Sequence, residues 1–513
     1  MTLAELLAAL GDLSSGVIAD EPAMGRAVRA LAYDSRRVSP GSVFVAVRGQ
    51  KADGAAFAAQ ALAKGALAVV AEAPPPPGVH ATWVTVTDGR AAMARLAAAF
   101  YGRPSREMQV VGITGTNGKT TTAYVLGALF EAAGTRCGML GTVVYRTGTG
   151  ERAATRTTPE AIDIQQLLRE MVAGGCGACV MEVSSHALAL RRADEIEFAA
   201  AIFTNLTRDH LDFHRDMESY FAAKRRLFEL LGPGVPAAIN LDDPRGATLA
   251  SLVSRPVTYA IDRPADVVPE GLAQSLRGVT FEARTPAGPV RIRSRLVGRP
   301  NVYNLLSAVT AAVSLGIPAP RIEEAIEALE GVPGRFQVVS TEQDDITVVV
   351  DYAHTDDALK NLLETARPLA SQRLITVFGC GGDRDRTKRP LMGAVAARLS
   401  DFVIVTSDNP RSEDPQQIID EIKRGIVVPP ERWRPSAPNA PQKYAPPRAT
   451  PHLAIVDRRL AIERAVEMAK PDDVVLLAGK GHEKYQVIGD RELPFDDVAV
   501  AREALARRRG RRA

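Results

Sequence analysis

Cysteine is scarce in this chain, and long apolar segments are missing. The 513 residues include four cysteines, at positions 137, 176, 179 and 380, a usage that suits a reducing compartment. No run of about 18 uncharged apolar residues occurs, so no membrane-spanning helix is expected. The first residues, MTLAELLAALGDLSSG, carry neither the basic segment nor the small-residue cleavage site of a secretory signal. We therefore expect a cytoplasmic protein without membrane insertion.

An excess of charge of one sign is also missing. Lys and Arg number 63 against 60 Asp and Glu, which leaves a net charge of +3. This balance offers no electrostatic reason to expect a nucleic acid or an anionic membrane as a partner. We expect small-molecule substrates and a monomer, and any anionic ligand must be held by local groups.

The one paired cysteine motif, Cys176-x-x-Cys179, has several interpretations. It could be a redox pair or half of a zinc site. However, no second pair or nearby histidine cluster completes a zinc site, and the motif leads into the apolar stretch ACVMEV. Buried packing of both thiols is the favoured interpretation.

The chain is too long for a single hydrophobic core. We predict three segments, at residues 1–100, 101–335 and 336–513, with boundaries near the turn-forming stretches YGRPSRE and GVPGRF. In the third segment, apolar strands such as ITVVVDYAH and DVVLLAGKGHE alternate with helical stretches, and the central segment repeats the pattern. This alternation indicates parallel α/β sheets covered on both faces. Most of these strands run into polar or glycine-rich residues, at the edge where open parallel sheets bind ligands.

The stretch GITGTNGKTTT, residues 112–122, links the apolar run MQVVGIT to a stretch of helical periodicity. Its glycines let backbone N–H groups converge on an anion at a helix N-terminus, while Lys119 adds a positive charge and Thr120 a hydroxyl for magnesium. The strict phosphate-loop pattern would require glycine where this chain has Ile113. A glycine turn without a ligand is the alternative, but the order of strand, glycines, lysine and threonines favours nucleotide phosphates.

A phosphate loop alone leaves three classes of protein open: a motor or switch NTPase, a kinase, and a ligase that uses ATP to activate a carboxylate. A switch protein would need a mobile element and no second substrate site. The rest of this chain offers several further candidate sites.

Three other residues are candidates for the same site. Glu182, in CVMEVSSH, and His210, in TNLTRDHLDFH, lie at the carboxyl ends of predicted strands and could coordinate magnesium, although each could also be a hydrogen-bonded structural residue. In SYFAAKRRLFELL, helical spacing places Lys224 on an apolar stripe with Tyr220 and Phe228. An unpaired ammonium there would be costly, so Lys224 reaches solvent, pairs with a carboxylate or serves a site.

Eight motifs follow one another between Gly115 and Glu483: GTNGKTT, EVSSH, TNLTRDHLDFH, YFAAK, NVYN, DYAHT, DNPR and GKGHE. In this order they resemble the Mur ligase family, and most closely its members that add meso-2,6-diaminopimelate. The first segment, with DSRRVSPGSVFVAVRGQKADG, is similar to the family's UDP-sugar-binding domain. The resemblance implies three α/β domains: a UDP-binding N-terminal domain, a central P-loop-type ATPase domain and a C-terminal doubly wound, Rossmann-like domain.

The resemblance also implies an activity. It is that of an ATP-dependent ligase joining meso-2,6-diaminopimelate to the D-glutamate of UDP-N-acetylmuramoyl-L-alanyl-D-glutamate through an acyl phosphate, in peptidoglycan precursor synthesis. ATP is implied as co-substrate and Mg²⁺ as cofactor. Thr120 and Glu182 match ligands of one magnesium and His210 of a second, while Lys224 matches a lysine that the family carbamylates (N6-carboxylysine) and that then binds the second magnesium. The implied catalytic residues are Lys119, Glu182, His210 and Lys224.

The resemblance assigns two sets of nucleotide and sugar contacts. The ATP contacts are Gly115, Thr116, Asn117, Gly118, Lys119, Thr120, Thr121, Asn304, Arg335 and Asp351. The contacts to the UDP-muramyl dipeptide are Tyr33, Ser35, Gln50, Lys51, Ala52, Thr157, Thr158, Ser184 and Arg192.

A third set concerns the incoming amino acid. The implied diaminopimelate contacts are Arg384, Asp408, Asn409, Pro410, Arg411, Gly479 and Glu483. Diaminopimelate carries a second carboxylate where lysine has none, and a guanidinium fork suits that group. Taken alone, DNPR could be an ordinary Asx-Pro turn, but GCGGDR and GKGHE at neighbouring strand ends favour binding.

The chain departs from the family's usual pattern at a few positions. Arg299 and Pro300 stand where an aromatic or small residue is usual, Asp356 where proline is common and Leu190 where glutamine often contacts the peptide. These changes concern adenine packing and peptide contacts rather than the reaction. We predict that the proline-rich residues 429–451 form a loop and that the arginine-rich end, RRRGRRA, is a solvated tail.

Overall fold

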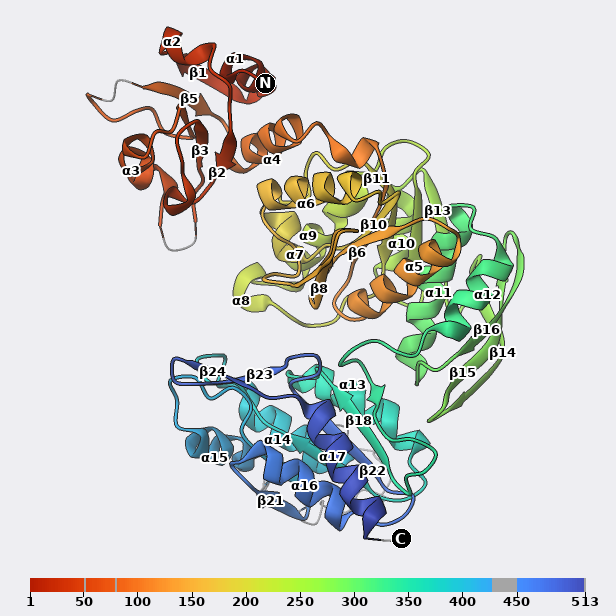
Figure 1. Ribbon diagram of the computed structural model, residues 1–513. Coiled ribbons are helices and arrows are strands. Elements are labelled where there is room, and N and C mark those ends of the chain that lie inside the picture. Colours follow the sequence, from red (N-terminus) through yellow and green to blue (C-terminus); the bar gives the residue numbers. More distant parts are fainter. Residues whose placement is uncertain (50–51, 79–80, 427–449, 512–513) are drawn as a thin grey trace, which may run out of the picture. The chain divides into compact units, whose positions relative to one another are not determined.

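The computed structural model describes residues 1–49, 52–78, 81–426 and 450–511 (Figure 1). The chain divides into two compact units. The first comprises residues 1–272, 281–292 and 302–328, and the second comprises residues 273–280, 293–301 and 329–513. The domain boundaries at residues 100 and 335 stay predictions.

A five-stranded sheet with the order β1-β5-β4-β3-β2 forms the N-terminal part of the first unit. Its strands are β1 (Ser14–Ile18), β2 (Ala30–Ala32), β3 (Ser42–Ala46), β4 (Ala68–Ala71) and β5 (Thr82–Val86). All neighbours are parallel except β1 and β5. The accompanying helices are α1 (Leu3–Ala8), α2 (Glu21–Met24), α3 (Ala58–Ala63) and α4 (Gly89–Phe100). Because β3 and β4 are buried at every position, this sheet is covered on both faces.

The central sheet has eight strands in the order β13-β12-β11-β6-β10-β7-β8-β9. The strands are β6 (Gln109–Thr114), β7 (Cys137–Leu140), β8 (Val144–Arg146), β9 (Glu151–Ala153), β10 (Ala178–Glu182), β11 (Phe198–Phe203), β12 (Pro236–Asn240) and β13 (Arg255–Tyr259). Strand β6 lies between its parallel neighbours β10 and β11, with Glu182 opposite Ile113 and Phe203 opposite Thr114. The carboxyl ends of these three strands therefore meet at one edge of the sheet.

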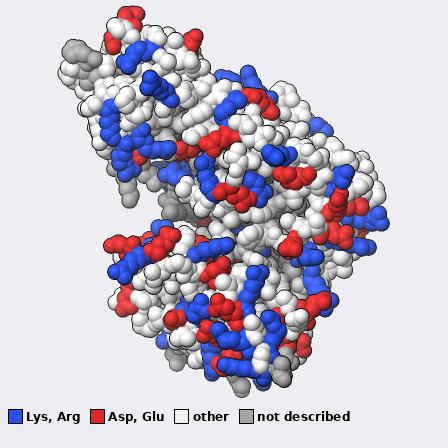
Figure 2. Space-filling view, viewed as in Figure 1, with Lys and Arg blue, Asp and Glu red and all other residues white. Residues whose placement is uncertain are grey.

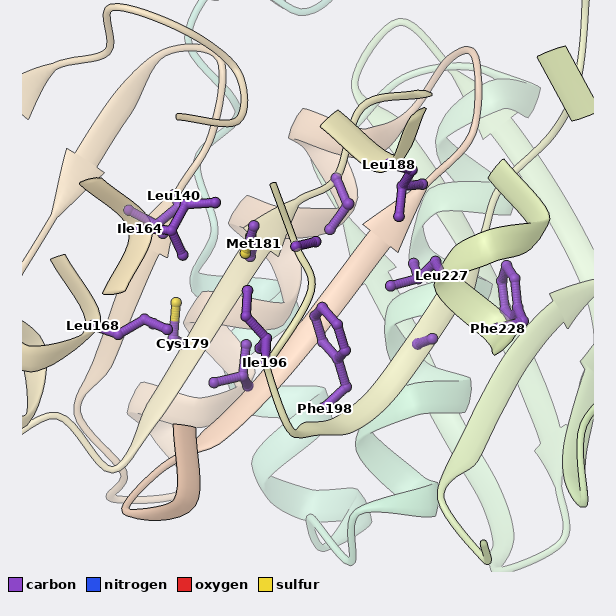
Figure 3. Packing of buried hydrophobic residues seen from close by; sticks show 14 of the residues in the cluster. Leu140, Ile164, Leu168, Cys179, Met181, Leu188, Ile196, Phe198, Leu227 and Phe228 are labelled. Carbon is purple, nitrogen blue, oxygen red and sulfur yellow. The ribbon is translucent and has the colours of Figure 1, made fainter. Parts of the chain in front are cut away.

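Helices and buried side chains cover this sheet. The helices are α5 (Lys119–Ala132), α6 (Ala161–Ala173), α7 (Ser185–Ala189), α8 (Leu211–His214), α9 (Met217–Glu229) and α10 (Gly246–Leu252). Figure 3 shows Met181 and Phe198 of the sheet in one cluster with Leu227 of α9. Cys176 and Cys179 are free thiols within this cluster, and burial raises the pKa of both. The prediction that this pair serves packing is confirmed.

A small three-stranded sheet and two helices follow. The strands are β14 (Val268–Ser275), β15 (Gly278–Thr285) and β16 (Gly288–Ser294), in that order across the sheet, and the helices are α11 (Arg299–Ser314) and α12 (Ala319–Ala328). Along β15 and β16 buried and exposed positions alternate, which is the pattern of a sheet with one face toward solvent.

The second unit holds a six-stranded sheet with the order β17-β18-β22-β19-β20-β21. The strands are β17 (Gln337–Val338), β18 (Thr347–Asp351), β19 (Leu374–Phe378), β20 (Phe402–Val405), β21 (His452–Ala454) and β22 (Val474–Ala478), with a separate hairpin of β23 (Tyr485–Ile488) and β24 (Arg491–Pro494). The helices are α13 (Asp356–Ala366), α14 (Lys388–Leu399), α15 (Pro415–Ile426), α16 (Arg458–Met468) and α17 (Asp497–Gly510). All pairs within the six-stranded sheet are parallel except β17 with β18, as the apolar strand sequences predict.

The parallel register brings four polar segments to one edge of this sheet. DYAH follows β18, GKGHE follows β22, GCGGDR follows β19 and SDNPR follows β20. In the described part of the chain, no helix combines the length and the apolar composition needed to cross a membrane.

The arginine-rich end differs from the prediction of a solvated tail. It continues α17 as far as Gly510, and Arg508 donates to the carboxylate of Asp345 at 2.8 Å. The side chain of Arg508 is 15% exposed, because the helix carries it back to the residues just before β18. Nearly all of residues 429–451 lie outside the described residues.

Candidate functional site

Two glycines shape the loop between β6 and α5. Gly115 has a φ of +149°, and a Cβ there would lie 1.9 Å from Thr204 Oγ1. Gly118 caps α5 with a φ of +88°, and a Cβ there would lie 2.3 Å from Asn304 Oδ1. A residue with a side chain would therefore be strained and would collide at both positions. The predicted strand, glycine turn and helix are confirmed, and Asn304 lies against the loop.

The segment after β11 holds this loop from the other side. The carbonyl of Asn117 accepts from Thr204 Oγ1 at 2.6 Å and from Asn205 Nδ2 at 3.1 Å, while its N–H donates to Asn205 Oδ1 at 3.0 Å. Thr116 donates its N–H to the carbonyl of Asn205 and lies 3.1 Å from the hydroxyl of Tyr220. The sequence did not predict that Thr204 and Asn205, the first residues of TNLTRDH, hold the loop.

Lys119 and Lys224 meet at one carbonyl oxygen. Lys119 Nζ donates to Gly115 and to Thr116 at 2.8 Å each, and Lys224 Nζ donates to Gly115 at 2.7 Å. Lys224 is 1% exposed and lies on the buried face of α9, which begins at the N-cap Asp216. Burial, and then the charge of Lys119, hold the pKa of Lys224 well below its usual range. Lys224 thus does not reach solvent.

Glu182 lies at the helix end of the same loop. Its Oε2 accepts from Thr120 Oγ1 at 3.1 Å and from Thr142 Oγ1 at 3.0 Å, and its Oε1 accepts from the Thr142 N–H at 2.8 Å. Thr142 also lies 3.1 Å from the hydroxyl of Thr157. The contact of Thr142 with Glu182 was not predicted, because nothing in the stretch LGTVVY indicates that this threonine lies close to Glu182. Thr121 is buried beside Thr120 on α5.

The donor set at this loop fits a hard cation. Carboxylate and hydroxyl oxygens of Glu182 and Thr120 are the ligands that Mg²⁺ prefers, and Mg²⁺ commonly takes the rest of its shell from phosphates and water. Within residues 1–49, 52–78, 81–426 and 450–511, no three His, Cys, Asp or Glu side chains form a metal cluster of their own. His210 has a φ of +53°, and its ring lies 4.8 Å from that of His186 and 6.1 Å from that of Tyr220.

The peptide-end residues form a hydrogen-bonded group beside Glu182. Thr158 Oγ1 donates to the carbonyl of Glu182 at 2.9 Å, and the N–H of Ser184 donates to Thr158 Oγ1 at 3.0 Å. Arg192 Nη1 donates to the Thr158 carbonyl at 3.1 Å, and Arg192 Nη2 pairs with Glu160 at 2.7 Å. Thr157, Thr158, Ser184 and Arg192 are therefore neighbours, as their assignment to one substrate requires. Glu160 was not anticipated.

The predicted UDP contacts divide between described and undescribed residues. Tyr33 and Ser35 follow β2; Tyr33 is partly buried, and Ser35 Oγ donates to Gln60 Oε1 at 2.8 Å. Ala52 is exposed, and its carbonyl accepts from the N–H of Gly49. Gln50 and Lys51 lie outside the described residues.

Arg335 and Asp351 lie together in the second unit. The carboxylate of Asp351 accepts from the N–H groups of Phe336 and Ala353, and burial raises its pKa while Arg335 lowers it. The guanidinium of Arg335 lies 5.0 Å from the ring centroid of Tyr352. The arrangement combines an aromatic face, a cation and a carboxylate, which suits a nucleoside.

Two arginines converge on Gly381 after β19. Measured from the position of a Cβ at Gly381, Arg411 Nη1 lies at 3.0 Å and Arg384 Cγ at 3.7 Å. Arg411 has a φ of +50°, and its Nη1 donates to the carbonyl of Gly382 at 2.7 Å. Arg384 is exposed at the same loop. The side chains of the two arginines predicted to bind one carboxylate thus both approach Gly381.

The acidic residues of the predicted amino-acid site lie on the neighbouring loops. Asp408 Oδ2 lies 3.6 Å from the Cβ position of Gly479, whose φ is +116°. Glu483 Oε2 accepts from Asn409 Nδ2 at 3.0 Å. Pro410 packs closely, since a Cβ at Gly382 would lie 1.9 Å from its carbonyl oxygen. Burial and the charge of Asp408 raise the pKa of Glu483.

Two buried cations near this site were also missed by sequence reasoning. Lys480 lies between Asp408 and Glu483, and Arg389 of α14 holds Glu413 and Glu421. The motif GKGHE includes Lys480. Because this segment is a loop, it has no apolar helix face, and so nothing in the sequence indicated that the lysine is buried.

Three parts of the chain match domains of one family. Residues 27–101 match the Mur ligase family, catalytic domain; residues 113–312 match the Mur ligase middle domain; and residues 334–481 match the Mur ligase, glutamate ligase domain.

Named relatives extend the likeness over nearly the whole chain. The chain is 47% identical over 484 residues to the UDP-N-acetylmuramoyl-L-alanyl-D-glutamate--2,6-diaminopimelate ligase of Solibacter usitatus (strain Ellin6076), with 93% of each protein covered. It is 46% identical to the protein of the same name from Gloeobacter violaceus (strain ATCC 29082 / PCC 7421), with 100% of this chain and 99% of that protein covered. A solved structure of a ligase with this name has a TM-score of 0.68 at 33% identity and covers 99% of both chains. The chain belongs to the Mur ligase family.

Proposed function

We propose that this protein is an ATP-dependent ligase that joins meso-2,6-diaminopimelate to the D-glutamate of UDP-N-acetylmuramoyl-L-alanyl-D-glutamate. The product is a peptidoglycan precursor, and the proposed site of action is the cytoplasm, with the protein as a monomer. The relatives reported above are named for this activity. The side chains at the carboxyl-end edges of the central sheet and of the six-stranded sheet suit its three substrates.

The reaction requires activation of a carboxylate. A carboxylate is a poor electrophile because an incoming amine meets negative charge and finds no leaving group. Transfer of the γ-phosphoryl group of ATP gives an acyl phosphate, which the amine attacks with phosphate as the leaving group. Proximity and charge stabilisation are the protein's contribution.

The glycine loop is proposed to hold the triphosphate. The free N–H groups at the start of α5 would donate to phosphate oxygens, and Lys119, the first residue of that helix, would add a positive charge. Magnesium, held by Thr120 and Glu182 and by His210 with Lys224, would neutralise phosphate charge. Asn304, Arg335 and Asp351 are the proposed contacts to the nucleoside.

We propose that Lys224 is carbamylated. Carbamylation needs a neutral amine, and the lowered pKa of Lys224 supplies one. In the unmodified protein two lysines donate to the single carbonyl of Gly115. A carbamate at Lys224 would add a negative charge that attracts the Lys119 ammonium, and it would offer oxygen ligands for magnesium.

The amino-acid specificity is assigned to the second unit. Arg384 and Arg411 would bind the distal carboxylate, while Asp408, Glu483 and the carbonyl of Gly479 would meet the ammonium. With lysine as substrate, two guanidinium groups would lack an anionic partner, which is a strong basis for rejection. The convergence of both arginines on Gly381 is the observation that carries this assignment.

The test is an assay of the purified full chain with UDP-muramyl dipeptide, ATP and magnesium. We expect phosphate release that depends on meso-diaminopimelate. Phosphate release with lysine but not with diaminopimelate would show that the protein is a lysine-adding member of the family. Slow ATP hydrolysis unaffected by any amino acid would instead indicate a nucleotide-dependent binding or regulatory protein.

A further inference from the structure

Lys480 is a fully buried cation near the proposed amino-acid site. It follows β22, and its side chain is 0% exposed. Its Nζ donates to Asn409 Oδ1 at 2.9 Å and to the carbonyl of Tyr485 at 2.7 Å. It also lies 3.3 Å from Asp408 Oδ1 and 3.6 Å from Glu483 Oε2. No substrate atom is needed to explain these contacts, so Lys480 belongs to the framework of the site.

The hydrogen bonds fix the orientation of the Asn409 side chain. Asn409 Oδ1 accepts from Lys480 and from the N–H of Val487 at 3.0 Å, while Asn409 Nδ2 donates to Glu483. An amide turned by 180° would present its NH₂ group to two donors. Lys480 therefore holds the amide in the one orientation that positions Glu483.

Two series of hydrogen bonds connect Asn409 with Arg411. The carbonyl of Asn409 accepts from the N–H of Gly382 at 2.8 Å, and the carbonyl of Gly382 accepts from Arg411 Nη1. On the other side, the N–H of Arg411 donates to the carbonyl of Val487 at 3.1 Å. The acidic and the basic ends of the site are thus connected through residues that Lys480 orders.

The charges of this group do not cancel. Asp408 is 6% exposed; among the described residues its Oδ1 forms the ion pair with Lys480 at 3.3 Å but accepts no hydrogen bond. Two carboxylates face one ammonium, so the group has an excess of one negative charge. The ion pair with Lys480 offsets part of the cost of burying this oxygen, and a hydrogen-bond donor of the substrate would offset more.

We propose that Lys480 is the positioning residue of the amino-acid site, orienting Asn409 and Glu483 and leaving one excess negative charge at Asp408 for the substrate ammonium. This inference rests on the proposed function. Without Lys480, the amide of Asn409 keeps only the N–H of Val487 to fix its orientation, and two uncompensated carboxylates repel each other.

Lys480→Met removes both the charge and the hydrogen bonds, whereas Lys480→Gln keeps a donor without the charge. For Lys480→Met we expect the KM for diaminopimelate to rise by about tenfold or more, with the KM for ATP nearly unchanged. Lys480→Gln should fall between Lys480→Met and the wild type.

A pH profile separates positioning from general destabilisation. Glu483 faces Asp408, Lys480, Tyr352, Tyr485 and Arg458, and Lys480 acts to lower its raised pKa. Losing Lys480 should raise the pKa of Glu483 further. The acid limb of kcat/KM for diaminopimelate then moves to higher pH in Lys480→Met, which a merely structural lysine would not cause.

The matched control is Arg373→Met. Arg373 pairs with the buried Asp473 at 2.6 Å at the opposite end of the same sheet. This variant should lose stability without a selective change in the KM for diaminopimelate. An equal rise of all KM values in Lys480→Met, or an unmoved acid limb, would overturn the proposal. A wild type without diaminopimelate-dependent phosphate release would overturn the proposed function instead.

A structure of the wild type with bound diaminopimelate decides the matter if neither variant folds. We expect Lys480 Nζ to stay on Asn409 Oδ1 and the substrate ammonium to reach Asp408 Oδ1. An ammonium that displaces Lys480, or one bound elsewhere, would show that the proposal is wrong.

Discussion

At the scale of single residues, buried cations distinguish this protein from an ordinary α/β fold. Lys224, Lys480 and Arg389 are each 0–1% exposed, and each contacts a loop at the carboxyl end of a strand. Charges are costly to bury, so a fold retains them where they have partners. Figure 2 shows that on the visible surface, by contrast, acidic and basic side chains are interspersed, in keeping with the small net charge.

Lys224 should respond to carbon dioxide supply. Because burial lowers its pKa, the neutral amine that carbamylation requires is favoured at Lys224. We expect a mass increase equal to one carbon dioxide in bicarbonate-rich buffer, and lower activity when bicarbonate is removed. The matched control is Lys224→Met, whose mass and residual activity should not respond to bicarbonate. An unmodified Lys224 in the active wild type would contradict carbamylation.

Arg411 should matter for one substrate only. We expect Arg411→Ala to raise the KM for diaminopimelate by about 10- to 100-fold, as for loss of a hydrogen bond between charged groups, with little effect on the KM for ATP. Arg411→Lys keeps the charge but not the planar fork, so it should recover part of the loss. Equal effects on both substrates would remove Arg411 from the amino-acid site.

At the scale of elements, the phosphate loop depends on a close approach of two segments. Gly115→Ala places a methyl group against Thr204, so we expect the Kd for ATP to rise by about tenfold or more and the Tm to fall. Gly134, beyond the other end of α5, has a φ of +80° but open space around its Cβ position. Gly134→Ala should cost about 1 kcal/mol in stability without weakening ATP binding. Similar losses of ATP affinity in both variants would contradict a specific role of the loop.

Helices α14 and α15 are joined by a buried guanidinium. Arg389 donates to Glu413 and Glu421 and to the carbonyl of Gly381. Arg389→Met leaves two carboxylates without this partner, and we expect the free energy of unfolding to fall by about 3–5 kcal/mol at pH 7. Denaturant unfolding of both proteins measures this difference.

The ion pair between Arg389 and Glu413 should make the stability of the protein depend on pH. Hydrogen bonding to Arg389 lowers the pKa of Glu413 from its ordinary value of 4.5 to about 2. The stabilisation from this carboxylate is therefore fully present above pH about 4.5 and is lost as the pH falls toward about 2. The difference in unfolding free energy between the wild type and Arg389→Met should shrink over this range. A constant difference would show that the pair does not contribute.

At the scale of the whole molecule, the first compact unit contains the five-stranded and the eight-stranded sheets, the second contains the six-stranded sheet, and each has its own buried clusters. We expect nucleotide with magnesium to slow hydrogen exchange at residues 112–122, and diaminopimelate to slow it at 380–384, 408–411 and 479–483. Lysine in place of diaminopimelate should protect the second unit less. Protection by diaminopimelate confined to the first unit would contradict the assignment of the amino-acid site.

Much of this organisation could be predicted from the sequence because it follows from local patterns. Apolar strands ending in glycine or polar residues predicted parallel sheets with ligands at one edge, and helical spacing predicted that Lys224 lies on a buried stripe. By contrast, Thr142, Asn205 and Lys480 carry no local signal. Their roles depend on strands and loops that are far apart in the chain and adjacent only in the sheet.

The order of motifs along the chain is enough to determine the family, the fold class and the residue types at the phosphate loop, since strand and helix periodicity and glycine turns are properties of short segments. Only the tertiary structure decides which groups share a partner: that Lys119 and Lys224 meet at Gly115, or that Lys480 lies between two carboxylates. Those contacts arise from sheet register and close packing, which bring together residues that no periodicity relates.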